Sequence, residues 1–434
     1  MRVTATFRAF SGKYAEKFVQ YGAGITMRVT TTFRAFSGKY AEKFVQYGAY
    51  CPTPLSLKKL ISFGRVGSAA KSAAFLRDEL AVRIANIMQE LHLLPEALIR
   101  TPSALIVERW YEQSFCHLVD YEGIEWNEKS LEKFNHTLAE IRHRHTTTVE
   151  TMAQGVMEME AQNKADPITN NHIQYFLDRF FMMRISLRML LNQHLLTFGS
   201  EFDKQRRFIG SIDPACNVLE IMEDAYGDAR YLCEHYYSVA PQLVVETCGA
   251  PQGQMDFVYV PSHLYHILFE LLKNALRAVV EHHGNSSSDL PPINVLVAVG
   301  HENITIKISD LGGGIPHSQM DLIFNYTYTT AHGKDRRPLG ESASNDLDTN
   351  APMAGYGYGL PLSRLYAKYF NGDLILTSVE GYGTDAIVYL KRNAAEADEI
   401  IPIFNRTSAR QYEISGVPVA DWSNPQFTTG WRRT

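Results

Sequence analysis

Three short segments decide the fold of this chain: ELLKNALR at residues 270–277, DLGGGIP at residues 310–316 and GYGYGL at residues 355–360. The first lies inside a helical pattern, the second follows a segment that alternates like a strand, and the third precedes another helix. Each segment alone is weak, because a GxGxG run is more often a tight loop than a nucleotide site, and DLGGG could form a hairpin. Their order, spacing and context together make the set specific.

The helix predicted over residues 259–283 carries the candidate catalytic side chains. Its buried stripe is apolar and consists of Leu264, Ile267, Leu268, Leu271, Leu272, Ala275 and Val279. His266, Glu270 and Asn274 fall on another stripe, because residues four apart lie one turn apart on the same side of a helix. Arg277 lies on that side too. Asn is a poor helix former, and a role as an oxygen ligand of Mg²⁺, with phosphates completing the shell, would compensate for its mid-helix position.

The two glycine-rich segments supply the other features of a nucleotide site. An Asp at the end of a strand, as Asp310 is, can accept a hydrogen bond from an exocyclic amine, and successive glycines let the backbone approach a flat ring. The glycines of residues 355–360, followed by a helix N-terminus, offer backbone N–H groups to an anion. Lys273 points away from the stripe of Glu270, and the sequence leaves a phosphate contact and a surface position equally open.

The first half of the chain is helical in pattern. Between residues 55 and 202 apolar residues recur at spacings of three and four, and no strand candidates interrupt them. Helices are predicted over residues 75–91, 105–118, 131–159 and 173–198. Four such helices suggest a bundle.

The second half combines helices with a small sheet. Strand-like alternation marks residues 295–299, 304–308 and 386–390, and residues 360–369 form a second helix, so an α/β sandwich is expected. Residues 333–352 are rich in Gly, Pro, Ser, Asn and Asp and predict a mobile loop. The expected domains are a basic N-terminal segment, a four-helix bundle, the α/β domain and an irregular C-terminal tail, at residues 1–49, 50–205, 213–392 and 393–434.

The N-terminal segment contains a single near-exact repeat. Residues 1–23 recur as residues 27–49 with one change, Ala5 against Thr31. Because solenoids need several diverged units, a gene-model error or a recent exon duplication explains the repeat better. Each copy is basic, rich in hydroxyl groups and free of acids before Glu16 or Glu42, which is typical of a mitochondrial transit segment. An ordinary basic first helix is the open alternative.

Composition narrows the class of protein. The 434 residues, 45% of them hydrophobic, suffice for two ordinary domains with their own cores. A formal net charge of -5 gives no general reason to expect nucleic-acid binding. Five cysteines without a CxxC pair suit a reducing compartment with unpaired thiols. No apolar run approaches the roughly 18 residues that span a bilayer, so a soluble protein is expected.

The three segments resemble the N, G1 and G2 boxes of the GHKL ATPase superfamily, which includes gyrase, Hsp90, histidine kinases and MutL. That resemblance implies a Bergerat-type α/β sandwich whose lid corresponds to residues 333–352. Longer matches are similar to mitochondrial pyruvate dehydrogenase kinases: ELLKNALRA at 270–278, YGYGLPLSRLYAKYF at 356–370, FLDRF at 176–180, PTPLSLK at 52–58, FLRDEL at 75–80 and RHRHT at 142–146. The dipeptide of Asp421 and Trp422 in the tail belongs to the same set.

The resemblance implies an ATP- and Mg²⁺-dependent protein-serine kinase of the mitochondrial matrix, with K⁺ as a further ion. Such a kinase phosphorylates and inactivates the E1 alpha subunit of the pyruvate dehydrogenase complex, forms a homodimer and binds the lipoyl domain of the E2 acetyltransferase. Glu270 would be the general base, His266 would position it or tune its basicity, and Asn274 would bind Mg²⁺. The implied ATP contacts are Glu270, Leu271, Leu272, Lys273, Asn274, Ala275, Leu276, Arg277, Asp310, Gly312, Gly314, Thr329, Thr330, Gly355, Tyr356, Gly357, Tyr358, Gly359, Leu360 and Thr384.

The resemblance also implies regulatory sites in the helical half. A pocket for pyruvate or dichloroacetate would be formed by Leu80, Tyr111, Ser114, Arg142, His145, Arg184 and Arg188. From the residues alone, these cations could equally pair with Asp120, Glu150 or Asp178. Phe63 and Phe75 would accept the lipoyl arm, with core packing as the alternative, and Asp421 with Trp422 would anchor the tail across a dimer. Met183, where relatives often have a small polar residue, would face either the pocket or the core.

Four other classes of protein compete with this interpretation. A branched-chain ketoacid dehydrogenase kinase is similar in the ATP boxes but lacks the Asp-Trp tail. A protein-histidine kinase needs a phosphoacceptor His followed by an acid, whereas His143 and His145 have none after them. An ATP-gated scaffold such as Hsp90 or MutL carries a long middle domain after the ATP module. A catalytically dead adaptor is disfavoured because Glu270, Asn274 and Asp310 are all present.

Overall fold

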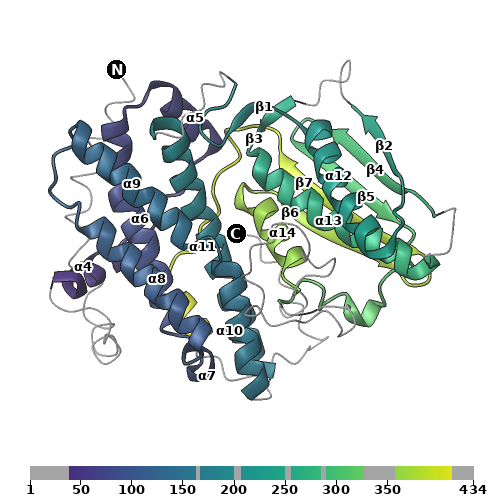
Figure 1. The fold of residues 1–434 in the computed structure, drawn as a ribbon, viewed down its shortest axis with the longest axis horizontal. Coiled ribbons are helices and arrows are strands. Elements are labelled where there is room, and N and C mark those ends of the chain that lie inside the picture. The colour runs from purple at the N-terminus through teal and green to yellow at the C-terminus, as the bar shows by residue number, and fades with distance from the viewer. Residues whose placement is uncertain are drawn as a thin grey trace.

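The computed structural model describes residues 39–162, 167–199, 207–249, 256–284, 290–326, 328 and 357–412. Figure 1 shows two parts side by side, a helical region and an α/β domain, with α11 and α14 at their junction. Buried apolar side chains of both parts belong to one hydrophobic cluster. The first copy of the repeat, residues 27–38 of the second copy, the loop at 333–352 and the Asp-Trp dipeptide lie outside the described residues, whereas residues 39–48 of the second copy form a helix.

The helical region packs its longest helices along one another. Its helices are α4 (Lys39–Gly48), α5 (Leu57–Val66), α6 (Ala69–Leu91), α7 (Glu96–Ile99), α8 (Pro102–Val119), α9 (Glu128–Arg144), α10 (Thr148–Gln162) and α11 (Pro167–Phe198). α6 contacts α8 and α11, and α11 contacts α9. Several helices begin where the side chain of a polar residue accepts a hydrogen bond from the first turn, as Ser68, Thr101 and Asn127 do.

The prediction of one continuous helix over residues 131–159 is wrong, because the structure has two helices there, α9 and α10. The break between the two helices consists of His145, Thr146 and Thr147. Thr148 Oγ1 donates to the His145 carbonyl at 3.0 Å, and Arg184 donates to the Thr146 carbonyl at 3.1 Å. These side chains satisfy carbonyls that would otherwise be left without partners at the end of α9. The apolar spacing continues through the break, so periodicity alone does not reveal it.

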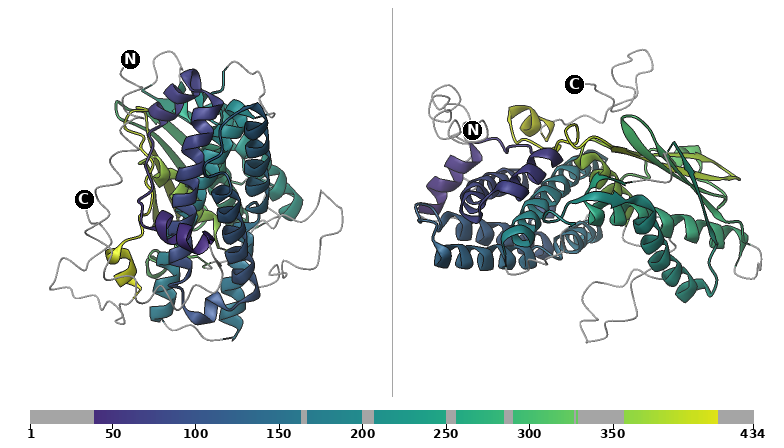
Figure 2. Two further views of the ribbon diagram at one scale, coloured as in Figure 1. Left: turned by 90° about the vertical axis from the view of Figure 1, so that its left-hand side faces the viewer. Right: turned by 90° about the horizontal axis from the view of Figure 1, so that it is seen from above.

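The α/β domain has one five-stranded sheet in the order β2-β4-β5-β7-β6, in which only β2 and β4 pair in parallel. Its strands are β2 (Leu243–Cys248), β4 (Ile293–Val299), β5 (Asn303–Asp310), β6 (Asp373–Val379) and β7 (Gly383–Lys391). β1 (Asp213–Asn217) and β3 (Asp256–Tyr259) form a separate pair. Helices α12 (Val218–Tyr237), α13 (Pro261–His283) and α14 (Gly359–Tyr369) cover one face of the larger sheet (Figure 2).

The strands predicted at 295–299, 304–308 and 386–390 lie within β4, β5 and β7. The tail after residue 392 was expected to be irregular, but it contains a short helix, α15 (Arg406–Gln411). In the α/β domain, a 3-10 turn, η3 (His317–Gln319), follows the glycine-rich loop. All five cysteines are free. Among the described helices, none is both long and apolar enough to cross a membrane.

Residues 393–404, here called the strap, run along the junction between the two parts (Figure 2). Backbone hydrogen bonds attach the strap to the start of α5 through the Ala397 carbonyl and to the segment before it through the Glu399 N–H. The N–H of Ile400 donates to the Tyr369 carbonyl at the end of α14. The strap therefore forms backbone hydrogen bonds with both the helical region and the α/β domain.

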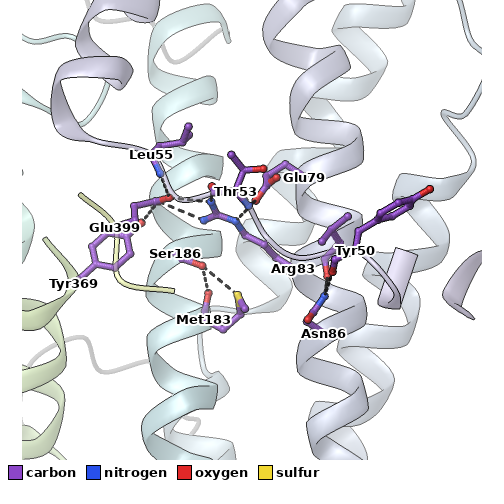
Figure 3. A network of polar contacts seen from close by, with 11 residues as sticks. Tyr50, Thr53, Leu55, Glu79, Arg83, Asn86, Met183, Ser186, Tyr369 and Glu399 are labelled. Carbon is purple, nitrogen blue, oxygen red and sulfur yellow. Dashed lines mark hydrogen bonds and ion pairs between the residues drawn. The ribbon is translucent and has the colours of Figure 1, made fainter. Parts of the chain in front are cut away.

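A buried ion cluster fixes the strap at its centre (Figure 3). The fully buried Arg83 guanidinium donates to Glu399 at 2.9 Å and to Glu79 at 2.8 Å. Glu399 also accepts from the Leu55 N–H at 2.9 Å and from the Tyr369 hydroxyl. Burial acts to lower the pKa of Arg83, but the two carboxylates more than offset it and hold that pKa above its ordinary value. Charge-assisted hydrogen bonds thus join the members of the cluster.

Replacing Arg83 with Ala should destabilise the protein strongly. The change leaves the Glu79 and Glu399 carboxylates buried beside each other without a counter-ion, which costs about 3–5 kcal/mol when a buried pair loses one partner. Chemical unfolding followed by circular dichroism should show a large fall in the midpoint. Arg230→Ala, which removes an exposed pair with Glu234, is the matched control and should move the midpoint little. Equal midpoints for the two variants would contradict the role of Arg83.

Candidate active site

Helix α13 presents Glu270 toward the start of α14. The helix opens with Pro261, which suits a first turn because the missing N–H has no partner there. Its buried side packs against α12 and β5 and includes four residues that were expected at the nucleotide, Leu271, Leu272, Ala275 and Leu276. Those four side chains lie in the core, whereas Glu270, Asn274 and Arg277 are only partly buried.

Glu270 is paired with a buried cation. The Lys273 ammonium donates to Glu270 Oε1 at 2.8 Å, and Lys273 is 7% exposed. A surface position for Lys273 is therefore wrong. This charge-assisted hydrogen bond holds the Glu270 carboxylate in one place.

The other oxygen of Glu270 lies against Gly359, the first residue of α14. A Cβ built on Gly359 would collide with Glu270 Oε2 and its carboxyl carbon. Gly is therefore required at this position to let the carboxylate approach the helix N-terminus, where backbone N–H groups lack partners within the helix. The arrangement places a fixed carboxylate beside a ready-made anion site.

His266 lies one turn before Glu270 and packs on Tyr366, with ring centroids 4.7 Å apart. Its Nε2 atom is buried and has no hydrogen-bond partner among the described residues. Burial lowers the pKa of His266, although the Glu270 carboxylate opposes that shift. The imidazole is thus neutral at physiological pH. No hydrogen bond joins the described side chains of His266 and Glu270.

The side chain of Asn274 makes no hydrogen bond to another described residue. An oxygen ligand for a divalent cation needs that freedom, so the residue fits the expected role. Arg277, on the same side of α13, lies 3.9 Å from Glu281 between Nε and Oε2. Among the described residues, no group of three or more His, Cys, Asp or Glu side chains could hold a metal.

Asp310 ends β5 opposite Thr384 of β7. Its Oδ1 accepts the Gly312 N–H at 2.9 Å. Burial raises the pKa of Asp310 to about 6, although hydrogen bonds from the backbone of Gly312 and Thr384 partly oppose the shift. At neutral pH the group is a carboxylate that can accept a further hydrogen bond.

The loop after Asp310 is folded tightly onto neighbouring backbone. Gly314 has a φ of +69°, and a Cβ there would collide with the Val379 carbonyl. Gly312 approaches the Ala278 side chain of α13, which leaves no room for a Cβ either. The glycines are thus needed for close packing of the loop against α13 and β6. Ser378, which sequence reasoning missed, accepts the Ile315 N–H at 2.7 Å and contacts the Thr384 hydroxyl at 2.9 Å.

The segment before α14 is described only from Gly357, which has a φ of +85°. Tyr358 is buried between Phe181 and Tyr326, at centroid distances of 5.8 and 5.2 Å, and Leu360 is partly buried within α14. Four expected ATP contacts, Thr329, Thr330, Gly355 and Tyr356, lie outside the described residues.

A small cavity in the helical region brings together most of the expected regulatory residues. Leu80, Tyr111, Arg142, His145, Arg184 and Arg188 line it, with additional apolar side chains. Ser114 lies just behind, with its hydroxyl 2.9 Å from His145 Nε2. Burial, reinforced by Arg144 and Arg184, lowers the pKa of His145 to about 3. The Tyr111 hydroxyl is buried without a partner among the described residues.

The acids that could have neutralised these cations are partly engaged elsewhere. Asp120 pairs with Lys39 at 2.8 Å, and Asp178 accepts the Tyr326 hydroxyl at 2.8 Å. Glu150 is exposed at the rim of a second cavity. Pairing with Asp120 or Asp178 is therefore wrong.

Three other expectations concern apolar residues and the tail. Met183 is buried in the core, where its sulfur lies 3.4 Å from the Ser186 hydroxyl, and it does not line the small cavity (Figure 3). Phe63 and Phe75 are partly buried, and Phe63 meets Phe198 edge-on at 6.3 Å. Asp421 and Trp422 lie outside the described residues.

Comparison with known families agrees with the division into two parts. Residues 54–213 match a family model described as mitochondrial branched-chain alpha-ketoacid dehydrogenase kinase. Residues 259–394 match the histidine kinase-, DNA gyrase B-, and HSP90-like ATPase model, and this range includes α13, β5 and α14. The fold and the site thus define an ATP-binding kinase of the GHKL class.

Individual relatives narrow the family. The mitochondrial [pyruvate dehydrogenase (acetyl-transferring)] kinase of Drosophila melanogaster is 50% identical over 86% of this chain and 89% of its own. Isozyme 3 of the kinase from Mus musculus is 48% identical over 87% of this chain and 89% of its own length. Isozyme 1 from Homo sapiens is 47% identical over 87% of this chain and 85% of its own length. The chain belongs to the mitochondrial pyruvate dehydrogenase kinase family. The histidine kinase, scaffold and branched-chain alternatives are set aside by these identities.

Nucleotide affinity should depend on pH through Asp310. Because its raised pKa is about 6, the acceptor carboxylate is present above that pH and is lost below it. Binding of a fluorescent ATP analogue should weaken about tenfold between roughly pH 7 and pH 5. Asp310→Asn should bind weakly with no such dependence. A parent curve that is flat over this range would contradict the adenine role of Asp310.

Proposed function

We propose that this chain transfers the γ-phosphoryl group of ATP to a serine of the E1 alpha subunit of the pyruvate dehydrogenase complex, in the mitochondrial matrix. The observation that carries the proposal is the Glu270 carboxylate, held by Lys273 and lying against Gly359 at the N-terminus of α14. Identity near 50% to kinases named for that reaction supports the choice of substrate. Phosphorylation of E1 alpha would inactivate the complex.

In this proposal Glu270 is the general base. It accepts the proton of the serine hydroxyl as the oxygen attacks phosphorus, which adds about 10²–10⁴-fold to the rate. The hydrogen bond from Lys273 holds the carboxylate in place, and the neighbouring His266 is neutral, so it adds no second charge beside Glu270. The catalytic group is thus ready before the substrate arrives.

The nucleotide would lie across α13, β5 and α14. Asp310 accepts a hydrogen bond from the adenine amine, the glycine loop at 312–314 lies against the ring, and the N-terminus of α14 receives the phosphates. Asn274 would hold Mg²⁺, which neutralises charge on the phosphates, and K⁺ would be a further ion there. Thr329, Thr330, Gly355 and Tyr356 would complete the contacts.

The helical region would be regulatory. Counting α9 and α10 as one interrupted member gives the proposed four-helix bundle of α6, α8, α9–α10 and α11. Its small cavity, with Arg142, Arg184 and Arg188, suits a carboxylate such as pyruvate or dichloroacetate. Phe63 and Phe75 would accept the lipoyl arm of the E2 component, and Asp421 with Trp422 would anchor the tail across a homodimer.

One assay tests the function directly. Purified protein is incubated with labelled ATP and the intact pyruvate dehydrogenase complex, and the labelled subunit and residue are identified by mass spectrometry. Label on a serine of E1 alpha is expected, with loss of dehydrogenase activity. Label on another subunit, or on histidine, would overturn the proposal.

Replacing Glu270 with Gln should separate binding from chemistry. The variant keeps the shape of the side chain but has no carboxylate to accept a proton, so turnover should fall about 10²–10⁴-fold while nucleotide affinity stays near that of the parent. Single-turnover transfer and equilibrium binding are the two measurements. A variant with full turnover would refute the general-base role.

Replacing Tyr111 with Phe should weaken inhibition by dichloroacetate. Tyr111 lines the small cavity, and its buried hydroxyl has no partner among the described residues. A carboxylate bound by that hydroxyl would lose a hydrogen bond worth about 0.5–1.5 kcal/mol, or roughly 2- to 12-fold in the midpoint. Each inhibition curve is normalised to the uninhibited rate of the same protein. Met183→Ser, which changes a core residue, should leave the midpoint unchanged. A shift with Met183→Ser but not with Tyr111→Phe would reverse the assignment.

A further inference from the structure

Helix α4 packs on α6 and α8, at the end of the helical region that lies away from the α/β domain (Figure 1). Its Phe44 and Tyr47 are buried. Both rings meet Phe115 of α8 edge-on, with centroids 5.7 and 6.0 Å apart. Such ring pairs stabilise a contact beyond the area that they bury. The surface on which α4 lies is here called the α4 surface, and its contacting residues are Asp78, Phe115, Asp120 and Glu122.

Opposite charges set the register of α4 on this surface. Lys39 donates to Asp120 at 2.8 Å, and Lys43 donates to Glu122 at 2.6 Å. The Tyr40 hydroxyl also donates to Asp120, at 2.9 Å. Ion pairs this exposed add little stability, but they are satisfied only when α4 lies in one position along α8. The α4 surface is therefore complementary in charge as well as in shape to a short basic helix.

The sequence of α4 occurs twice in the chain. Residues 13–22 repeat residues 39–48 without a change, and they lie outside the described residues. The side chains of α4 that contact the α4 surface thus have identical counterparts, which are Lys13, Tyr14, Lys17, Phe18 and Tyr21. A helix of 10 residues is marginal in water on its own, so α4 depends on docking for its stability. The first copy would gain the same stabilisation from the same surface.

The length of the tether decides which copy is favoured. The chain after α4 is fixed at Tyr50, whose carbonyl accepts from Asn86 of α6 at 3.0 Å. Gly48 lies 2 residues before this anchor, whereas Gly22, the matching end of the first copy, lies 28 residues before it. Since the probability of closing a loop falls about as the −3/2 power of its length, the first copy is disfavoured roughly 50-fold. Truncating a buried Phe costs roughly 100- to 5,000-fold, which exceeds that deficit.

We propose that the α4 surface accepts either copy of the repeated segment, and that residues 13–22 replace α4 in the same molecule when α4 cannot bind. The second copy fills the surface in the parent protein because its tether is shorter. The exchange also bears on the regulatory half, because Phe115 is next to Ser114, whose hydroxyl contacts His145 beside the small cavity. A surface that stays filled keeps this part of α8 covered. The proposal does not depend on the kinase activity.

Carbodiimide crosslinking of the full chain tests the exchange. The reagent joins an ammonium and a carboxylate in contact as an amide and takes up the water released. A crosslinked lysine is not cut by trypsin, so Lys43 joined to Glu122 appears in the peptide of residues 40–58, and Lys17 joined to Glu122 in that of residues 14–28. These peptides differ after the repeat and are separated by mass spectrometry. The parent should give the Lys43 product in roughly 50-fold excess.

Two matched substitutions shift the competition. Phe44→Asp places a charge at a buried position of α4, so the Lys17 product should become the main one while the thermal midpoint stays near that of the parent. Phe18→Asp makes the same change in the first copy and should alter neither the product nor the midpoint. The double variant should form neither product, and its midpoint should fall clearly below that of Phe44→Asp.

Three results would overturn the proposal. The first is Phe44→Asp without the Lys17 product, and the second is a midpoint for Phe44→Asp as low as that of the double variant. The third is a Lys17 product found only in covalent dimers, which gel electrophoresis separates, because the first copy would then bind a neighbouring molecule and not its own. All three measurements are made without a substrate, so failure of the kinase assay leaves their outcome unchanged.

Discussion

The Arg83 guanidinium, closed off from solvent, is shared between Glu79 on its own helix and Glu399, which lies 316 positions further along the chain. Glu399 in turn accepts the hydroxyl of Tyr369, the last residue of α14. The first residue of α14 is Gly359, against which Glu270 lies. The position of the candidate base is thus connected through one helix to an ion cluster in the helical region. Since each member is buried and hydrogen-bonded, small displacements at the cluster are resisted strongly.

The same geometry explains why Glu270 is suited to proton transfer. The Lys273 ammonium donates to one oxygen of the Glu270 carboxylate at 2.8 Å, and Gly359 at the start of α14 lies against the other oxygen. Lys273 therefore acts on the base, a role that its helical position three residues away allows. Asp310 lacks a cationic neighbour of this kind among the described residues, and its pKa is raised accordingly.

The sequence predicts features whose cause is local. The apolar stripe of α13 and strands β4, β5 and β7 follow from periodicity, and the structure has them as expected. β2 was missed because it is an edge strand whose residues Val244 and Val245 are exposed, so no alternation marks it. The break between α9 and α10 depends on Arg184 from another helix. The ion cluster and the small cavity join residues far apart in sequence, which no local pattern encodes.

The strap has a consequence for how the molecule can be divided. Residues 393–404 follow the α/β domain in the chain, yet their partners include Leu55, α5 and Arg83 of the helical region. The chain thus closes on itself, and calorimetry would see one melting unit because neither part retains its full set of contacts once separated. A chimera that exchanges regulatory regions between kinases of this family would need to carry the strap with the helical region. Cutting at the apparent domain boundary would remove Glu399, one of the two carboxylates that pair with the buried Arg83.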